Sequence, residues 1–255
     1  MQLKNVYNAI DSLAPFSLSE EYCDTYNFRD NSGIILDCGE DVKGVLCSLD
    51  LSHRAVEAAR AAGANVIFTH HPAIFNPIYS LRSNDPLTLC ARAGISVISA
   101  HLNLDAARGG IDEELMFGLG GSAGKLLHPL AEGGYGHVFS VHEEELSAFT
   151  ERIKARFSTE RVVVYGDRPV KKVSSFCGAG MDESTVAFAL AEGADTFLSS
   201  DGKHHLIAQL VTHNVNVILL THYAAENYGF VRFAENLRNK LKGLPVSVFT
   251  DERLL

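Results

Sequence analysis

The sequence has 255 residues, of which 46% are apolar, so the chain is long enough for a globular protein with a substantial hydrophobic core. It carries 22 basic and 31 acidic residues, and the net charge of -9 argues against a broad nucleic-acid-binding surface. Five cysteines without CxxC spacing argue against a disulfide framework or a thiolate zinc site, and no apolar stretch reaches membrane-spanning length, so we expect a cytoplasmic protein.

The first half of the chain predicts a strand-helix-strand unit. An apolar run at residues 45–50 precedes a helical pattern at 52–62, in which Ser52 is a suitable N-cap and Gly63 a suitable C-terminal stop. A second apolar run follows at 65–68. Such a connection is right-handed and makes its two strands parallel, so groups that follow the strands gather at one edge of the sheet.

The second half repeats this pattern. An apolar run at 173–177 precedes a helical pattern at 183–192, which Asp182 can cap and Gly193 can end, and another apolar run follows at 195–198. A pattern that occurs twice in the same order indicates a duplicated α/β fold with parallel strands. We therefore predict two α/β repeats.

Each half also has a further apolar run that ends in a histidine, with a carboxylate four residues later. Residues 94–100 lead to His101 and Asp105, and the corresponding run of the second half leads to His222 and Glu226. Because duplicated folds place equivalent residues at related points, two such pairs indicate one site with paired ligands. A two-metal centre is the sharpest interpretation of this spacing.

The segment Thr69-His70-His71-Pro72 follows a predicted buried strand. Neighbouring residues of an extended chain point to opposite sides, so His70 and His71 can serve two different ions of one centre only if the backbone turns at the strand end. Pro72 favours such a turn, because it restricts the residue before it and cannot continue a helix. The alternative is a pair of surface histidines. The position at the same sheet edge as the other pairs favours metal binding.

The predicted ligands are imidazoles and carboxylates, which suit Zn, Mn, Fe, Co or Ni and leave the metal open. Two ions that share a carboxylate would lower the pKa of a bridging water and polarise a substrate, so hydrolysis is the implied reaction class. Glu226 has a structural alternative. It lies near the first turn of a helix predicted at 225–241, where the helix dipole favours a carboxylate.

Three further polar residues follow the predicted strand at 195–198, namely Asp201, Lys203 and His205. Asp201 aligns through the repeat with His71, so these residues could border the same cleft and contact a substrate phosphate. The alternative for this segment is the solvated start of a helix.

Five separate blocks of the sequence resemble the Nif-three-like family, whose members are often labelled GTP cyclohydrolase I type 2 homologues. The blocks are DNSG from Asp30, FTHHPAIF from Phe68, SAHLNLDAARGGIDEEL from Ser99, SSDGKHH from Ser199 and THYAAE from Thr221. The resemblance covers nearly the whole chain. It implies two intertwined α/β repeats with mixed, largely parallel sheets, in a short form without an inserted domain, with the first repeat at residues 1–127 and the second at 128–255.

The resemblance also implies two divalent metal ions per subunit and a ring-shaped homohexamer built as a trimer of dimers. Its implied metal ligands are His70, His71, Asp105, His222 and Glu226, with Glu226 bridging both ions. His101 would be a further ligand or a catalytic proton carrier.

The sequence departs from the family pattern near the implied pocket. Arg29 stands where a Trp is usual, and Ser199-Ser200-Asp201 replaces Thr-Gly-Asp. These changes leave the ligands intact and the substrate open. The resemblance implies a dinuclear metal-dependent hydrolase of the GTP cyclohydrolase I type 2 type, acting on a nucleotide or related heterocycle, and a phosphoesterase could use the same centre. The alternative is a non-catalytic metal-binding regulatory or protein-interaction protein.

Overall fold

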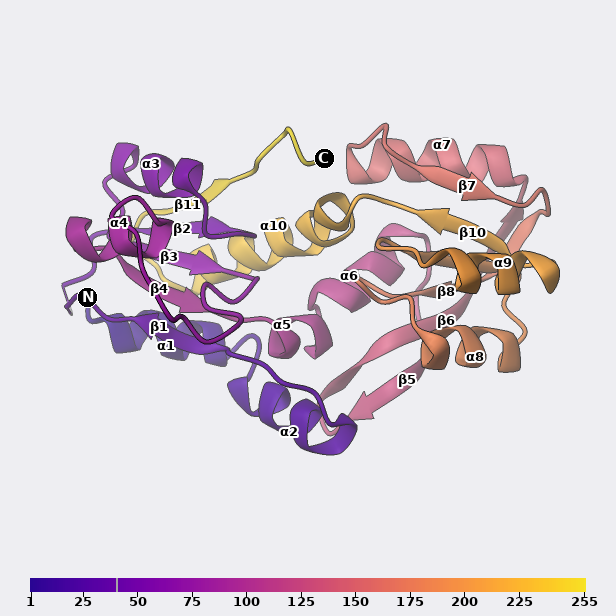
Figure 1. Ribbon diagram of the computed structural model, residues 1–255, viewed down its shortest axis with the longest axis horizontal. Coiled ribbons are helices and arrows are strands. Elements are labelled where there is room, and N and C mark those ends of the chain that lie inside the picture. The colour runs from indigo at the N-terminus through magenta and orange to yellow at the C-terminus, as the bar shows by residue number, and fades with distance from the viewer. Residues whose placement is uncertain (40) are drawn as a thin grey trace. The chain divides into compact units, whose positions relative to one another are not determined.

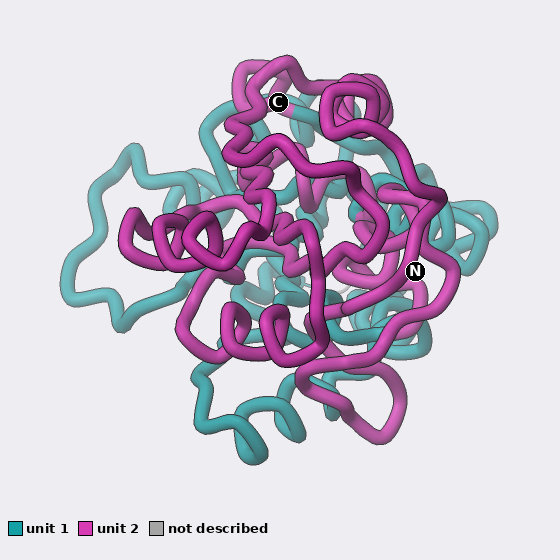
Figure 2. The backbone as a smooth tube through the Cα atoms, turned by 90° about the vertical axis from the view of Figure 1, so that its right-hand side faces the viewer, with its two compact units in different colours: residues 1–107, 230–250 teal, residues 108–229, 251–255 magenta. Residues whose placement is uncertain are grey.

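The computed structural model describes residues 1–39 and 41–255. The chain divides into two units, which Figure 2 shows in different colours. Unit 1 comprises residues 1–107 and 230–250, and unit 2 comprises residues 108–229 and 251–255. Each unit therefore contains two separate stretches of chain. The boundary predicted between residues 127 and 128 concerns the sequence repeat and stays a prediction.

Unit 1 contains a five-stranded sheet in the order β1-β4-β3-β2-β11. Strands β4, β3, β2 and β11 are parallel, and β1 pairs antiparallel with β4 (Figure 1). Its elements in chain order are α1 (Leu3–Asp11), α2 (Phe16–Tyr26), β1 (Gly33–Leu36), β2 (Val45–Ser48), α3 (His53–Ala61), β3 (Val66–Thr69), α4 (Pro86–Ala93), β4 (Ser96–Ser99), α5 (Leu102–Ala106) and β11 (Val246–Phe249).

The local signals of unit 1 act as predicted. Every residue of β2, β3 and β4 is buried, which explains why these strands read as continuous apolar runs rather than alternating ones. The Ser52 side chain accepts a hydrogen bond from Ala55 N and caps α3. Gly63 ends this helix region with a φ of 66°, a conformation that glycine adopts without steric cost. The parallel βαβ prediction is confirmed.

Unit 2 contains a six-stranded sheet in the order β5-β6-β8-β9-β10-β7. Its elements are α6 (Ile111–Gly118), β5 (Lys125–Leu130), β6 (Gly133–Glu144), α7 (Leu146–Phe157), β7 (Val163–Tyr165), β8 (Val170–Ser175), α8 (Glu183–Ala191), β9 (Thr196–Ser199), α9 (His204–Thr212) and β10 (Asn216–Leu219). Both sheets are mixed, as predicted. Parallel pairing is nevertheless confined to β8, β9 and β10 in unit 2, because the hairpin β5-β6 and the edge strand β7 add antiparallel pairs.

Helix α10 (His222–Lys240) begins earlier than the sequence pattern predicts. The Thr221 hydroxyl accepts a hydrogen bond from Ala224 N at 3.0 Å, so Thr221 satisfies a free amide of the first turn. Glu226 consequently lies on the second turn of the helix rather than near its start. In α8 the predicted cap is confirmed, because the Asp182 side chain accepts hydrogen bonds from Ser184 N and Thr185 N.

Across residues 1–39 and 41–255, no helix combines the length and apolar character that crossing a bilayer requires.

Candidate metal centre

His70 and His71 follow the last residue of β3, and both rings are held at Nδ1. The His70 side chain is buried, and its Nδ1 donates a hydrogen bond to the Ala100 carbonyl at 3.0 Å. His71 Nδ1 lies 2.7 Å from Asp50 Oδ1, which follows β2. The two ring centroids are 4.8 Å apart. The backbone therefore turns after Thr69 enough for neighbouring histidines to face one region, as the sequence predicts.

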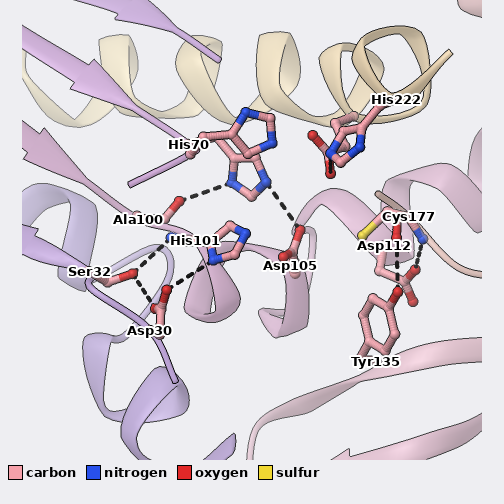
Figure 3. Close-up of polar contacts among 12 residues, drawn as sticks. Asp30, Ser32, His70, Ala100, His101, Asp105, Asp112, Tyr135, Cys177 and His222 are labelled. Carbon is pink, nitrogen blue, oxygen red and sulfur yellow. Dashed lines mark hydrogen bonds and ion pairs between the residues drawn. The ribbon is translucent and has the colours of Figure 1, made fainter. Parts of the chain in front are cut away.

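His101 follows β4 and is held by Asp30. Its Nδ1 lies 2.9 Å from Asp30 Oδ1, and its backbone amide donates to Ser32 Oγ at 2.9 Å (Figure 3). Asp30 Oδ2 accepts hydrogen bonds from the hydroxyls of Ser19 and Ser32 at 2.5 and 2.6 Å. This carboxylate thus anchors the loop before β1 to His101, which follows β4.

The environment of the Asp30–His101 pair favours the charged form of both side chains. Burial alone would raise the pKa of Asp30, but the hydrogen bond and charge of His101 and the serine hydroxyls outweigh it and lower the pKa to about 2. Burial likewise disfavours the charged His101 ring. The hydrogen bond to Asp30 and the nearby Asp105 charge outweigh that effect and raise the His101 pKa.

Asp105 completes a group of three ligand side chains in unit 1. It lies on α5, four residues after His101, and its Oδ1 is 3.5 Å from His70 Nε2 (Figure 3). Ligand atoms of His70, His101 and Asp105 all lie within 4.8 Å of one another. Two ligands that are each about 2 Å from one ion are roughly 3 to 4 Å apart. The 3.5 Å between His70 Nε2 and Asp105 Oδ1 lies in that range.

Unit 2 contains the second predicted pair, His222 and Glu226, one turn apart on α10. His222 Nε2 lies 3.0 Å from Glu226 Oε1, and His222 Nδ1 lies 2.8 Å from Asp201 Oδ2, after β9. Gly178 follows β8 and has a φ of 59°. A Cβ at this position would lie only 2.6 Å from Glu226 Oε1, so the close approach of this turn to the carboxylate requires glycine.

The turn that contains Gly178 is supported by a buried carboxylate, Asp112 of α6. Asp112 Oδ1 accepts from Cys177 N at 2.9 Å, and Oδ2 accepts from Gly136 N at 2.7 Å and from His137 Nδ1 at 2.8 Å. The Cys177 carbonyl accepts from the Tyr135 hydroxyl at 2.8 Å (Figure 3). The Cys177 peptide is therefore bound on both its N–H and C=O sides.

The predicted site residues thus gather within each unit. His70, His71, His101 and Asp105 meet in unit 1, and His222 and Glu226 meet in unit 2. Asp201 lies beside His222 as its hydrogen-bond partner. Lys203 takes the N-cap position of α9, and His205 Nε2 lies 3.6 Å from the exposed Glu183 carboxylate.

The sequence pattern does not predict Asp30, Asp50 or Asp112 as site residues. Asp30 belongs to the DNSG block, and Asp50 ends the apolar run at 45–50. Both residues therefore lie in recognisable segments, but residue spacing alone assigns them no role in the site. Asp112 lies in the GGIDEEL part of another block. The site groups that they hold, His71, His101 and the Cys177 amide, are 21 to 71 positions away in the chain, which is why only the fold identifies these carboxylates.

One feature is common to the four site histidines. Nδ1 of His70, His71, His101 and His222 is engaged by a carbonyl or carboxylate oxygen. This arrangement fixes the tautomer and the ring orientation and makes Nε2 the nitrogen that a metal ion would take. Metal-binding histidines in proteins are held in this way. The residues present therefore fit a metal centre of imidazole and carboxylate ligands.

A family model of Duf34/NIF3 (NGG1p interacting factor 3) matches residues 1–253. The chain belongs to the Duf34/NIF3 family. This confirms the resemblance that the five sequence blocks indicate. Its similarity extends to curated proteins named "GTP cyclohydrolase 1 type 2 homolog". One from Lactococcus lactis is 31% identical, covering 81% of this chain and 82% of that protein, and one from Clostridium perfringens is 27% identical, covering 94% and 93%.

Solved structures show the Duf34/NIF3 fold directly. A hypothetical protein of Staphylococcus aureus superposes with a TM-score of 0.84 at 24% identity, covering 98% of this chain and 97% of that one. A Bacillus cereus protein related to NIF3 gives a TM-score of 0.85 at 18% identity, with 99% and 97% covered. At these identities the likeness establishes the fold alone.

Proposed function

We propose that the protein is a metal-dependent hydrolase with a dinuclear centre. The ligands that the sequence predicts for this centre are His70, His71, Asp105, His222 and Glu226. The observation that carries this proposal is the Nδ1 anchoring of the three ligand histidines, because it orients imidazoles as metal ligands are oriented. The repeated His-x3-carboxylate spacing supports the assignment of one pair from each repeat to the same centre.

Divalent ions at such a centre lower the pKa of water into the neutral range and polarise the bond that is hydrolysed. His101 is the proton carrier. Because Asp30 accepts the hydrogen bond of His101 Nδ1, the exchangeable proton is carried at Nε2. The Asp30 carboxylate also stabilises the ring when it is charged, which suits a group that accepts a proton from water and returns it to the leaving group.

The substrate that we propose is GTP or a related nucleotide or heterocycle. Support comes from the name of the curated relatives, "GTP cyclohydrolase 1 type 2 homolog", at up to 31% identity over most of the chain. We also propose the ring-shaped homohexamer that the resemblance implies and the cytoplasmic location that the sequence composition predicts. Equilibrium sedimentation tests the assembly, since the hexamer predicts six times the mass of one chain.

The test starts from protein purified without chelators, whose metal content is measured by elemental analysis. The proposal expects two ions per chain and release of formate or phosphate from GTP. Glu226→Gln should lower turnover at least a hundredfold while the unfolding transition is unchanged. Glu235→Gln, the same change at an exposed residue of α10, serves as the control and should keep the turnover of the wild type. Full metal content without product from any nucleotide tested would contradict the hydrolase and favour the non-catalytic alternative.

A further inference from the structure

Strand β7 (Val163–Tyr165) is the exposed edge of the sheet in unit 2. It pairs antiparallel with β10 on one side, and no strand of the described part of the chain pairs with its other side. All three side chains are apolar or aromatic, and they are exposed by 49, 37 and 40%. An exposed edge with such side chains is a template for an additional strand.

The strand is paired with β10, and the turn that follows it is held by Asn216 of β10. Asn216 Oδ1 accepts a hydrogen bond from Arg168 N at 3.1 Å, and its Nδ2 donates to the Arg168 carbonyl at 2.9 Å. Gly166 turns tightly over the same side chain, with a φ of 104° and with Asn216 Oδ1 only 2.3 Å from the position of a Cβ. Because the strand is already fixed, a partner that binds it would lose little free energy to ordering this edge.

A groove with a volume of about 440 Å³ lies beside this edge and is lined by residues of β7 and of the first turns of α7. Figure 1 shows these two elements next to each other in unit 2. Leu146, Thr150 and Val164 contribute to its lining. The side chains of Leu146 and Thr150 are buried within unit 2, whereas that of Val164 is exposed. The groove therefore offers an apolar wall that continues from the side chains of the edge strand.

The rim of the groove is acidic. Glu145, Glu151 and Asp167 line it, and all three are exposed. Glu151 is 2.8 Å from Lys154, but no ion pair within the described residues involves Glu145 or Asp167. A nearby cation, Arg168, directs its guanidinium to the Asn214 carbonyl. The rim thus favours a cationic partner.

We propose that β7 and the adjacent groove bind an extended basic segment of another protein. The segment adds to β7 as a new edge strand and places a lysine or arginine side chain at the acidic rim, a recognition mode in which backbone hydrogen bonds give affinity and side-chain pockets give specificity. Since successive side chains of a strand point to opposite faces, basic and β-branched residues should alternate along it. This inference uses none of the metal-site residues.

A second copy of this chain is a poorer occupant than a basic segment. Two copies paired through β7 would bring their own Glu145 and Asp167 carboxylates toward one another, and juxtaposed like charges oppose association. The chain as a whole has a net charge of -9, which adds to this repulsion. Charge complementarity therefore selects a basic partner.

The probe for the test is a fluorescein-labelled hexapeptide of alternating lysine and valine, with a peptide of alternating glutamate and valine as its counterpart. Fluorescence polarisation should show at least tenfold tighter binding of the basic peptide to the full-length protein. Hydrogen exchange should slow at the amides of residues 163–165 when the basic peptide is bound. Equal affinity for both peptides, or unchanged exchange at these amides, would overturn the proposal.

Two variants connect the binding to this surface. Val164→Lys places a charge on the edge, and Glu145→Gln combined with Asp167→Asn removes the rim charges, so each should weaken basic-peptide binding at least tenfold. Val211→Lys is the matched control, since Val211 is a 40% exposed valine on α9 of the same unit, and it should bind like the wild type. Unchanged binding by the first two variants, or a fall in native mass caused by Val164→Lys, would show that strand addition by a basic segment is wrong.

Discussion

Asp30 and His101 are 71 positions apart in the chain, yet Asp30 Oδ1 accepts the hydrogen bond of His101 Nδ1 at 2.9 Å. The carboxylate is otherwise surrounded by two serine hydroxyls, and its pKa falls to about 2. It therefore stays ionised at every pH at which the protein would work. The pair joins the loop before β1 to the end of β4 and fixes both the position and the tautomer of the proposed proton carrier.

Replacing Asp30 by asparagine should separate proton transfer from metal binding. Asp30→Asn keeps the size of the side chain but removes the charge that orients His101, and loss of such a partner typically lowers activity about 10- to 100-fold. Metal content should stay near that of the wild type, because Asp30 is not a proposed ligand. Asp37→Asn, a charge change on an exposed residue of unit 1, is the control. Equal loss of turnover in both variants would show that the effect is unspecific.

The same substitution should change stability in acid. The Asp30 pKa of about 2, against an ordinary value of 3.8, stabilises the folded protein above the unfolded-state pKa, and this contribution is lost as the pH falls through 2. The difference in unfolding free energy between wild type and Asp30→Asn should therefore be about 2 kcal/mol at neutral pH and shrink in acid. Urea titrations between pH 7 and pH 2.5 measure it, and a difference independent of pH would contradict the assignment.

Local sequence signals predict much of the fold because they act over a few residues. Ser52 and Asp182 cap the helices that follow them, and Gly63 and Gly193 adopt the left-handed conformation that ends them. Fully buried parallel strands are recognisable as continuous apolar runs. The start of α10 shifts because Thr221 also acts as a cap, which an apolar pattern does not reveal.

The site is predictable only where its chemistry is concentrated in short motifs. His70 and His71 are adjacent, and His101 and Asp105 are one turn apart, so spacing identifies them before any fold is known. The carboxylate that holds His71 follows a different strand, and its role appears only when β2 and β3 pair in register. Long-range hydrogen bonds of this kind leave no local pattern.

Gly178→Ala should weaken metal binding by displacing Glu226. The new methyl group would lie 2.6 Å from Glu226 Oε1, a distance at which the carboxylate must move, and the φ of 59° adds about 1 to 2 kcal/mol of backbone strain. Gly193→Ala is a matched control, because its φ is 67° and no atom lies within 4 Å of the new Cβ. Calorimetric titration with Zn²⁺ or Mn²⁺ should show weaker binding only for Gly178→Ala, although both variants lose similar stability. Identical metal affinities would mean that Glu226 is not a ligand.

Asp201→Asn should also weaken metal binding, through the ring of His222. Asp201 Oδ2 lies 2.8 Å from His222 Nδ1, and removing such a partner typically costs about 10- to 100-fold in metal affinity. Asp167→Asn makes the same change on another exposed aspartate of unit 2 and should leave the affinity unchanged. Competition with a chromophoric chelator measures both constants. An Asp201→Asn protein that binds metal like the wild type would show that His222 needs no such support.

His137 should make stability depend on pH near neutrality. Burial disfavours its charged form, but the hydrogen bond and charge of Asp112 outweigh burial and raise its pKa above the ordinary value of 6.5. The charged pair therefore stabilises the fold fully below pH 6.5, and this contribution is lost as the pH rises through the raised pKa. Urea titrations measure this contribution. Between pH 6 and pH 9 the unfolding free energy of the wild type should fall relative to that of His137→Gln. His142 is an exposed histidine of the same strand, so His142→Gln is the control and should behave like the wild type. Parallel curves for wild type and His137→Gln would show that the buried ring does not titrate with folding.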